Sequence, residues 1–254
     1  MDQNPISRYS RAYLSPFTTN LLHGRNPYVV AAWSLFAPGL GSLLQNRLFK
    51  GLILIVWSTF LNTASNINLS VWYSMTGRFE FAKAVIHTRW LLLYLAVYVY
   101  AVWDSYRGTV TFNQLAILAH REDAPLQPLV IKTLDVNFLD KRSPWLAAAW
   151  SAMAPGLGNL YLHRIISGVF FIAWTIVVLY LSHGLQAIHW TMTGRFDEAK
   201  AIVDMQWLLY IPAIYGHQMY DSYSAAVEYN KLFEEEQSKW LRDHYQERSF
   251  VMPL

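Results

Sequence analysis

The chain has 254 residues, of which 54% are hydrophobic and 15% are charged, and its formal net charge is +3. Ordinary soluble domains contain about 25% charged residues, so this composition favours a membrane protein. The absence of cysteine excludes a disulfide scaffold, thiol catalysis, Cys-ligated zinc and iron–sulfur clusters, and the small net charge does not favour a nucleic-acid partner.

The chain begins with a polar stretch that lacks the apolar core of a secretory signal, and residues 1–13 are interpreted as an N-terminal tail. The first uncharged segment, residues 26–46, is interrupted by an Ala-Pro-Gly-Leu-Gly motif at residues 37–41. The same motif interrupts residues 143–163. Because Pro and Gly break helices, both segments are predicted to be re-entrant or interfacial rather than full spans.

Four further segments are predicted to be transmembrane helices. Gly51–Ser74 and Ile165–Gly194 carry no charge, and each contains the roughly 20 apolar residues that a span needs. Trp90–Trp103 and Met205–Tyr220 are shorter and lie between charged residues, which we expect at the membrane interfaces. Trp and Tyr gather at the ends of these segments, as in the aromatic belts of membrane proteins.

Short helices are predicted outside the membrane. A Met-Thr-Gly-Arg-Phe motif at residues 75–79, repeated at residues 192–196, is followed by an acidic residue and Ala-Lys-Ala, which is typical of a turn and a short amphipathic helix. Thr76 and Thr193 are the expected N-caps of these two helices. Residues 224–247 carry an apolar stripe at helical spacing within a charged segment, so we expect a helix that packs against another surface.

The chain aligns with itself without a gap when it is shifted by 117 residues. Residues 27–106 and 144–223 share 32 identities in 80 positions, which indicates a tandem duplication. The predicted units are an N-terminal tail (1–13), a first membrane repeat (14–118), a linker (119–130), a second membrane repeat (131–235), and a charged C-terminal helix and tail (236–254).

Two topologies fit these segments: parallel repeats of two spans each, or inverted repeats of three spans each. The parallel arrangement places 15 of the Lys and Arg residues on the side of the termini and 5 on the other side, whereas the inverted arrangement divides them 11 to 9. Because Lys and Arg gather on the cytoplasmic side, we expect parallel repeats with both termini in the cytoplasm. The predicted fold is an all-α integral membrane protein in a prokaryotic cytoplasmic membrane. Each repeat has a re-entrant Pro-Gly-Leu-Gly segment, a transmembrane hairpin and a short outer amphipathic helix.

The Pro-Gly-Leu-Gly motif is followed in both copies by Arg and then Gly, namely Arg47 and Gly51, and Arg164 and Gly168. In this respect the chain resembles small prokaryotic membrane proteins of the TM2-like group, which carry a Pro-Gly-x-Gly-x-x-Tyr-x-Gly turn before a hydrophobic hairpin. Tyr161 matches the aromatic position, whereas its counterpart is a leucine and the Gly expected two residues later is absent from both copies. The resemblance implies the hairpin and no particular activity.

Two sets of repeated residues are candidate functional sites. The turn motif offers backbone amides that could bind an anion, but we favour a tight turn in which Gly supplies a positive φ or close packing. Its residues are Pro38, Gly39, Gly41, Pro155, Gly156 and Gly158. Asp104 and Asp221 end the second spans and could relay protons or bind a cation. We favour structural ion pairs with Arg47 and Arg164, which begin the first spans on the same side.

Polar side chains inside the spans predict a small polar cavity or a subunit contact, because such groups are costly in lipid. The candidates are Asn62, Asn66, His183 and His217. The two histidines could also ligate a b-type haem, but their counterparts in the first repeat are Asn66 and Tyr100, so we expect no cofactor and no metal.

No nucleophile–base arrangement, phosphate loop or metal-ligand spacing is present, so the chain is not expected to be an enzyme. The favoured hypothesis is a non-enzymatic accessory or scaffold subunit that contacts the lipid bilayer and other membrane subunits. A transporter or channel built from two parallel repeats is the alternative, and a haem-binding subunit is a minor one. A transporter favours ionisable or broken-helix sites near the midplane, and Pro212 is the only mid-span proline.

Overall fold

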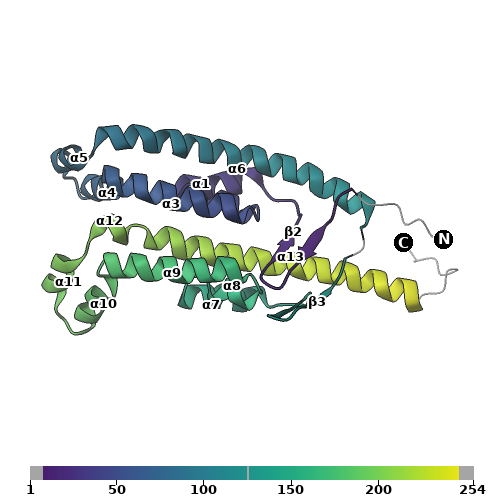
Figure 1. Cartoon of the computed structure of the whole chain (residues 1–254). Coiled ribbons are helices and arrows are strands. Elements are labelled where there is room, and N and C mark those ends of the chain that lie inside the picture. Colours follow the sequence, from purple (N-terminus) through teal and green to yellow (C-terminus); the bar gives the residue numbers. More distant parts are fainter. Residues whose placement is uncertain (1–7, 125, 246–254) are drawn as a thin grey trace.

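The computed structural model describes residues 8–124 and 126–245 and is predominantly helical, as predicted. The long helices run side by side along one direction, and the two halves of the chain lie one above the other (Figure 1). The short helices α5, α10 and α11 form one end of the molecule, and the β-strands lie toward the other end (Figure 1).

Each half begins with a small antiparallel β-hairpin, which the sequence did not predict. The first half contains β1 (Ala12–Leu14), β2 (Thr19–Leu21), α1 (Pro27–Phe36), α2 (Leu40–Leu44), α3 (Leu48–Ser65), α4 (Ile67–Met75), α5 (Phe79–Val85) and α6 (Thr88–Glu122). The second half contains β3 (Leu129–Ile131), β4 (Val136–Phe138), α7 (Pro144–Met153), α8 (Leu157–Tyr161), α9 (Ile165–Leu181), α10 (Gly184–Met192), α11 (Phe196–Ile202), α12 (Met205–Leu208) and α13 (Ile211–Tyr245).

Every element of the first half has a counterpart that starts 117 residues later, from the hairpins to the short helices. The one difference concerns α6, which is continuous, whereas its counterpart is divided into α12 and α13. Pro212 lies at the second residue of α13. Because proline has no N–H to donate to the preceding turn, it accounts for this division.

Both predicted first spans are broken toward their C-terminal ends. Asn66, with φ of 56°, separates α3 from α4, and His183, with φ of 53°, separates α9 from α10. By length and composition, α3 alone is long and apolar enough to cross a membrane. Two bent pairs also qualify if each counts as one span, namely α5 with α6 (89°) and α9 with α10 (64°). The described residues therefore hold between one and three of the four expected spans.

The short helices expected after the two Met-Thr-Gly-Arg-Phe motifs are present as α5 and α11, but their expected caps are wrong. The N-cap residues are Arg78 and Arg195, and neither side chain makes a capping hydrogen bond. The hydroxyl of Thr76 instead donates back to the carbonyls of Trp72 and Tyr73 at the end of α4. Thr193 does the same at the end of α10. Both threonines therefore complete the preceding helix rather than start the next one.

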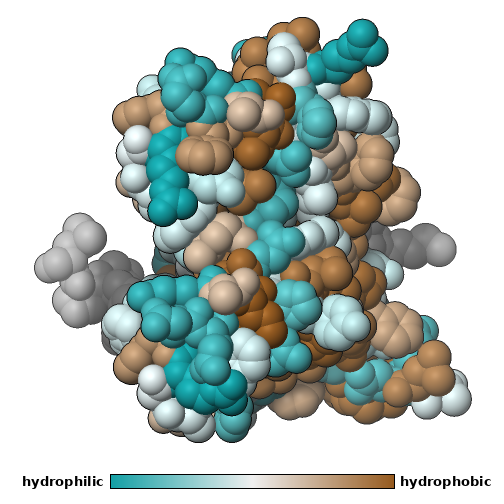
Figure 2. Space-filling model, turned by 90° about the vertical axis from the view of Figure 1, so that its left-hand side faces the viewer, coloured by the Kyte–Doolittle hydropathy of each residue, from teal (hydrophilic) through white to brown (hydrophobic). Residues whose placement is uncertain are grey.

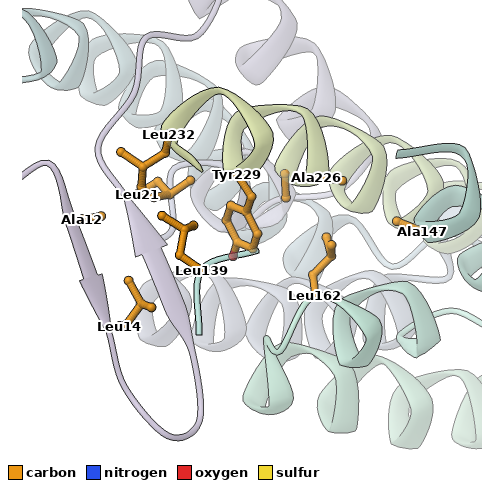
Figure 3. Close-up of a cluster of buried hydrophobic side chains, with 10 residues drawn as sticks. Ala12, Leu14, Leu21, Leu139, Ala147, Leu162, Ala226, Tyr229 and Leu232 are labelled. Carbon is orange, nitrogen blue, oxygen red and sulfur yellow. The ribbon is translucent and has the colours of Figure 1, made fainter. Parts of the chain in front are cut away.

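The hairpin β1–β2 of the first half packs on the second half. Its side chains join a buried cluster with Leu162, Tyr229 and Leu232, as Figure 3 shows. The hydroxyl of Tyr229 donates to the carbonyl of Thr19 (2.9 Å). The amide of Ile165 donates to the carbonyl of Phe17 (3.0 Å). These contacts cover the end of α9 at which the predicted Arg164 pair lies.

The predicted unit boundaries fall within or close to regular elements. Residues 12–13 of the predicted tail belong to β1, and the predicted linker contains the end of α6 and the start of β3. Residues 224–245 continue α13 without a break, so the charged C-terminal helix is the extension of a predicted span. Residues 1–7 and 246–254, which belong to the two predicted tails, lie outside the described residues.

Candidate functional site

The Pro-Gly-Leu-Gly motif forms the same tight turn in both halves. Gly39 has φ of 104° and Gly156 has φ of 101°, a conformation that favours glycine. A Cβ atom on Gly41 would lie 2.3 Å from the Ser34 hydroxyl oxygen and 2.6 Å from the carbonyl oxygen of Val30. The turn thus brings α2 close to α1 and α6. These positions agree with the structural interpretation of the motif, which needs no bound anion.

The structure brings Arg47 and Asp104 together at one end of the hairpin in the first half. The Arg47 guanidinium donates to one carboxylate oxygen of Asp104 (3.0 Å). Lys50 donates to the other oxygen (2.6 Å) and to the hydroxyl of Tyr100 (2.7 Å). The sequence analysis missed Lys50, although its position one helical turn after Arg47 was a usable signal.

The counterpart pair of the second half is more deeply buried. Arg164 donates to Asp221 at 2.7 Å, and the two side chains are 3% and 2% exposed, whereas those of Arg47 and Asp104 are 30% and 14% exposed. Ser167 replaces Lys50 in this half, and the second carboxylate oxygen of Asp221 has no hydrogen-bond partner. Burial alone would raise the pKa of Asp221, but the charge of Arg164 outweighs burial and holds that pKa below its usual range.

Three amides form a closed polar network between the two halves. Gln206 on α12 donates to the side-chain oxygen of Asn62 (2.8 Å), and Asn62 donates to Asn68 (3.0 Å). Asn68 in turn donates to the carbonyl of Gln206 (2.9 Å). The side-chain oxygen of Gln206 accepts from the amide of Leu69 (2.9 Å). Asn62 was predicted, whereas Gln206 was missed because only tertiary packing places α12 beside α4.

The predicted polar cavity is small and does not unite the four candidate residues. A cavity of about 60 Å³ lies beside Asn62 and Asn68, which is room for a few water molecules. Asn66 donates to the carbonyl of Val85 at the break between α3 and α4. His183 is exposed at the corresponding break and contacts Gln186 (3.1 Å). Asn66 and His183 therefore act at helix breaks rather than in a shared cavity.

His217 lies in the buried interior between the halves. Its Nε2 lies 3.2 Å from the carbonyl oxygen of Leu40, and its ring packs against Trp33 and Phe171. The structure therefore does not bring His183 and His217 together as a ligand pair. Among residues 8–124 and 126–245, no group of three or more His, Asp or Glu side chains could hold a metal ion.

The outward faces of the long helices are apolar. Exposed large side chains occur along α3, α6 and α9, and include Ile53, Val56, Trp57, Phe60, Leu92, Leu95, Val99, Trp103, Val169, Ile176 and Tyr180. Figure 2 looks along the helices from the end with α5, α10 and α11. Hydrophilic side chains cover much of the two tips that face the viewer, and hydrophobic side chains gather at the right-hand side (Figure 2).

Comparison with models of protein families, with curated proteins and with solved structures gave no match.

Proposed function

We propose that this chain is an integral membrane protein that acts by contact, as a non-enzymatic accessory or scaffold subunit of a larger membrane assembly. The observation that carries the proposal is the distribution of polarity. The long helices expose apolar side chains outward, while the amide side chains of Asn62, Asn68 and Gln206 between the halves are bonded to one another. Such an arrangement suits lipid and protein neighbours and leaves little polar surface for a solute path.

The proposed topology has four spans and two parallel repeats. The five Lys and Arg residues assigned to the outer side lie at or near α5 and α11: Arg78, Lys83, Arg89, Arg195 and Lys200. These helices form one end of the molecule, and the β-hairpins lie toward the opposite end (Figure 1). Arg11, Arg121, Lys141 and Arg142 belong to the hairpins' flanks or to the end of α6. This separation supports cytoplasmic termini by the positive-inside rule. The breaks at Asn66 and His183 shorten the apolar helices, so α4 and α10 would lie at the outer interface.

The proposed partner surface is the last part of α13. Trp240, Leu241 and Tyr245 are exposed there. Tyr229 and Leu232, which lie earlier on the same helix, are buried. Aromatic side chains of this kind are typical anchors of protein interfaces. Deleting residues 224–254 would remove core side chains, so point substitutions near the end of the helix are the sharper test.

The test is purification of the full-length protein from its native membrane in mild detergent. A scaffold subunit would co-purify in a stoichiometric complex. Replacing Trp240 and Leu241 by Glu should reduce that association at least about tenfold. The matched control replaces the neighbouring exposed Gln237 and Ser238 by Glu, which adds the same charge and should leave the complex intact.

The alternative, a transporter or channel, predicts a different result for the purified protein in liposomes. Solute or ion flux by the purified protein alone in liposomes, lost when Asn62 or Gln206 is replaced by Leu, would show that the proposed class is wrong. A fully monomeric protein that supports no complex in native membranes would also contradict the scaffold role.

A further inference from the structure

A cavity of about 570 Å³ opens between the C-terminal halves of α6 and α13. The end of β2 and the segment that follows it, residues 21–25, lie between these helices and line the cavity (Figure 1). The apolar part of the lining includes Leu22, Ala116 and Ile117. The remainder of the lining is polar and charged, and includes Arg25 and Arg121 as well as the carboxylates of Glu228 and Glu235. The volume lies in the range of small-molecule sites, and the lining combines apolar and polar side chains as such sites do.

The positive charges around this cavity are unequally compensated. Arg11 is paired with Asp123, Glu235 and Glu236. Lys231 is paired with Glu228 (3.0 Å). In contrast, Arg25 and Arg121 make no ion pair with any of the residues that the structure describes. Asp221 and Glu228 attract Arg25 through space, but their own ion pairs are with Arg164 and Lys231.

Arg25 is also poorly hydrogen-bonded for a partly buried guanidinium. Its Nη1 lies 3.4 Å from the Ser224 hydroxyl, and its Nε is buried with no hydrogen-bond partner. Burial lowers the pKa of Arg25. Burial together with the charge of Arg25 lowers the pKa of the adjacent His23 to about 3. A desolvated charge without a direct ion-pair partner is costly, so an anion bound at this position would be stabilised by Arg25.

The counterpart of Arg25 shows that this environment is specific to the first half. Arg25 and Arg142 have the same backbone setting, because each exchanges two hydrogen bonds with an asparagine of the long helix, Asn113 and Asn230. The Arg142 guanidinium, however, stacks over the rings of Phe138 (5.3 Å) and Tyr161 (5.5 Å).

The residues that correspond to these two rings are Leu21 and Leu44. The first half therefore lacks the aromatic platform, and its arginine lines the cavity instead. The backbones of Arg25 and Arg142 are held alike, so the difference lies in the side chains around each guanidinium group. Arg142 stacks on aromatic rings, whereas Arg25 has leucines at the corresponding positions.

We propose that this cavity binds a small organic anion, a phosphate or carboxylate with an apolar body, whose charge pairs with Arg25 and Arg121 and whose body packs on Leu22, Ala116 and Ile117. The site is independent of the scaffold role proposed above. The anion comes from the aqueous phase rather than from the bilayer. Ten residues of α6 separate Trp103, the end of the predicted span, from Asn113 at the cavity, which is about 15 Å along the helix.

The test uses the full-length protein in nanodiscs of phosphatidylcholine, titrated with phenyl phosphate in a calorimeter. We expect saturable binding at one site, with inorganic phosphate binding more weakly and benzyl alcohol not binding. Arg25→Ala should weaken phenyl phosphate binding at least about tenfold. Arg142→Ala is the matched control and should bind as the unchanged protein does.

A second variant separates binding from folding. Ala116→Trp keeps every charge and places an indole ring in the apolar part of the cavity, so it should also weaken phenyl phosphate binding while the thermal transition of the ligand-free protein is retained. The proposal is overturned if the unchanged protein shows no saturable binding, or if Arg25→Ala and Ala116→Trp both bind normally. Loss of binding when phosphatidylglycerol is added to the nanodiscs would contradict the aqueous origin and assign the site to a lipid headgroup.

Discussion

Asp104 and Asp221 hold the same position in the two halves, but their surroundings differ. Asp221 is almost fully buried with one cation, whereas Asp104 is partly exposed with two. Removing one partner of a buried pair costs about 3–5 kcal/mol because the other charge is left uncompensated, whereas exposed pairs contribute about 0–1 kcal/mol. We therefore expect Asp221→Asn to lower the free energy of unfolding several-fold more than Asp104→Asn, as measured by thermal unfolding in detergent. Equal effects of the two substitutions would contradict this account of burial.

His23 gives the protein a predicted sensitivity to acid. Its pKa is lowered from 6.5 to about 3 by burial and by Arg25. Between these values the unfolded chain binds a proton that the folded protein does not, so stability falls as pH falls from about 6.5 toward 3. The slope for one such proton is at most about 1.4 kcal/mol per pH unit. His23→Gln should flatten the stability profile in this window, whereas replacing the exposed His189 by Gln should not. An unchanged profile for His23→Gln would contradict the prediction.

At the scale of elements, the turn between α7 and α8 depends on the absence of a side chain at Gly158. A Cβ there would lie 2.2 Å from the Ser151 hydroxyl oxygen and 2.3 Å from the carbonyl oxygen of Ala147. It would also disturb the hydrogen bond between Ser151 and Ser222 (2.9 Å). We expect Gly158→Ala to destabilise the protein by about 1–3 kcal/mol, because the backbone cannot move aside without separating the helices.

Gly216 provides the matched control for this substitution. It lies within α13, and a Cβ there would meet Trp33 at 3.5 Å, an ordinary contact distance. Alanine favours the helix over glycine, so Gly216→Ala should leave stability unchanged or raise it by up to about 1 kcal/mol. Thermal unfolding of both variants checks the contrast, and similar effects at the two glycines would refute it.

Features that depend on local rules were predictable from the sequence. Proline and glycine mark the turns before α2 and α8, and the repeated Arg and Asp of each half pair as their positions suggested. Features that depend on tertiary packing were not. Three-residue strands carry too little alternation to be detected, and nothing local distinguishes Asn66 or His183 as a helix break. Gln206 joins the polar network only because the two halves pack against each other.

At the scale of the whole molecule, the two halves share their element order but not their contacts. Leu14 and Leu21 of the first hairpin are buried against the second half. Their counterparts in the second hairpin, Ile131 and Phe138, are 68% and 47% exposed. The hairpin of the first half also covers the Arg164 pair, which explains why only this pair is fully buried. Two halves with the same element order thus play unequal structural roles.

The last prediction concerns the proposed topology, which cysteine labelling can test. The chain contains no cysteine, so a single introduced cysteine is labelled without background. Glu80 lies on α5 with an exposed side chain, and Leu118 lies near the far end of α6 and is 39% exposed. The 30 residue steps of α6 from Thr88 to Leu118 cover about 45 Å at 1.5 Å per residue. A bilayer is about 40–45 Å thick including its headgroups. α5 is bent by 89° against α6 and adds little to this length.

With cytoplasmic termini, a membrane-impermeant maleimide added to intact cells should label Glu80→Cys and leave Leu118→Cys unlabelled until the cells are opened. Asp197→Cys, the counterpart of Glu80→Cys in the second half, should behave as Glu80→Cys does, because parallel repeats place α5 and α11 on the same side. Inverted repeats would place them on opposite sides. Labelling of Glu80→Cys but not Asp197→Cys in intact cells would therefore overturn the parallel arrangement, and labelling of Leu118→Cys from outside would overturn the assignment of the termini.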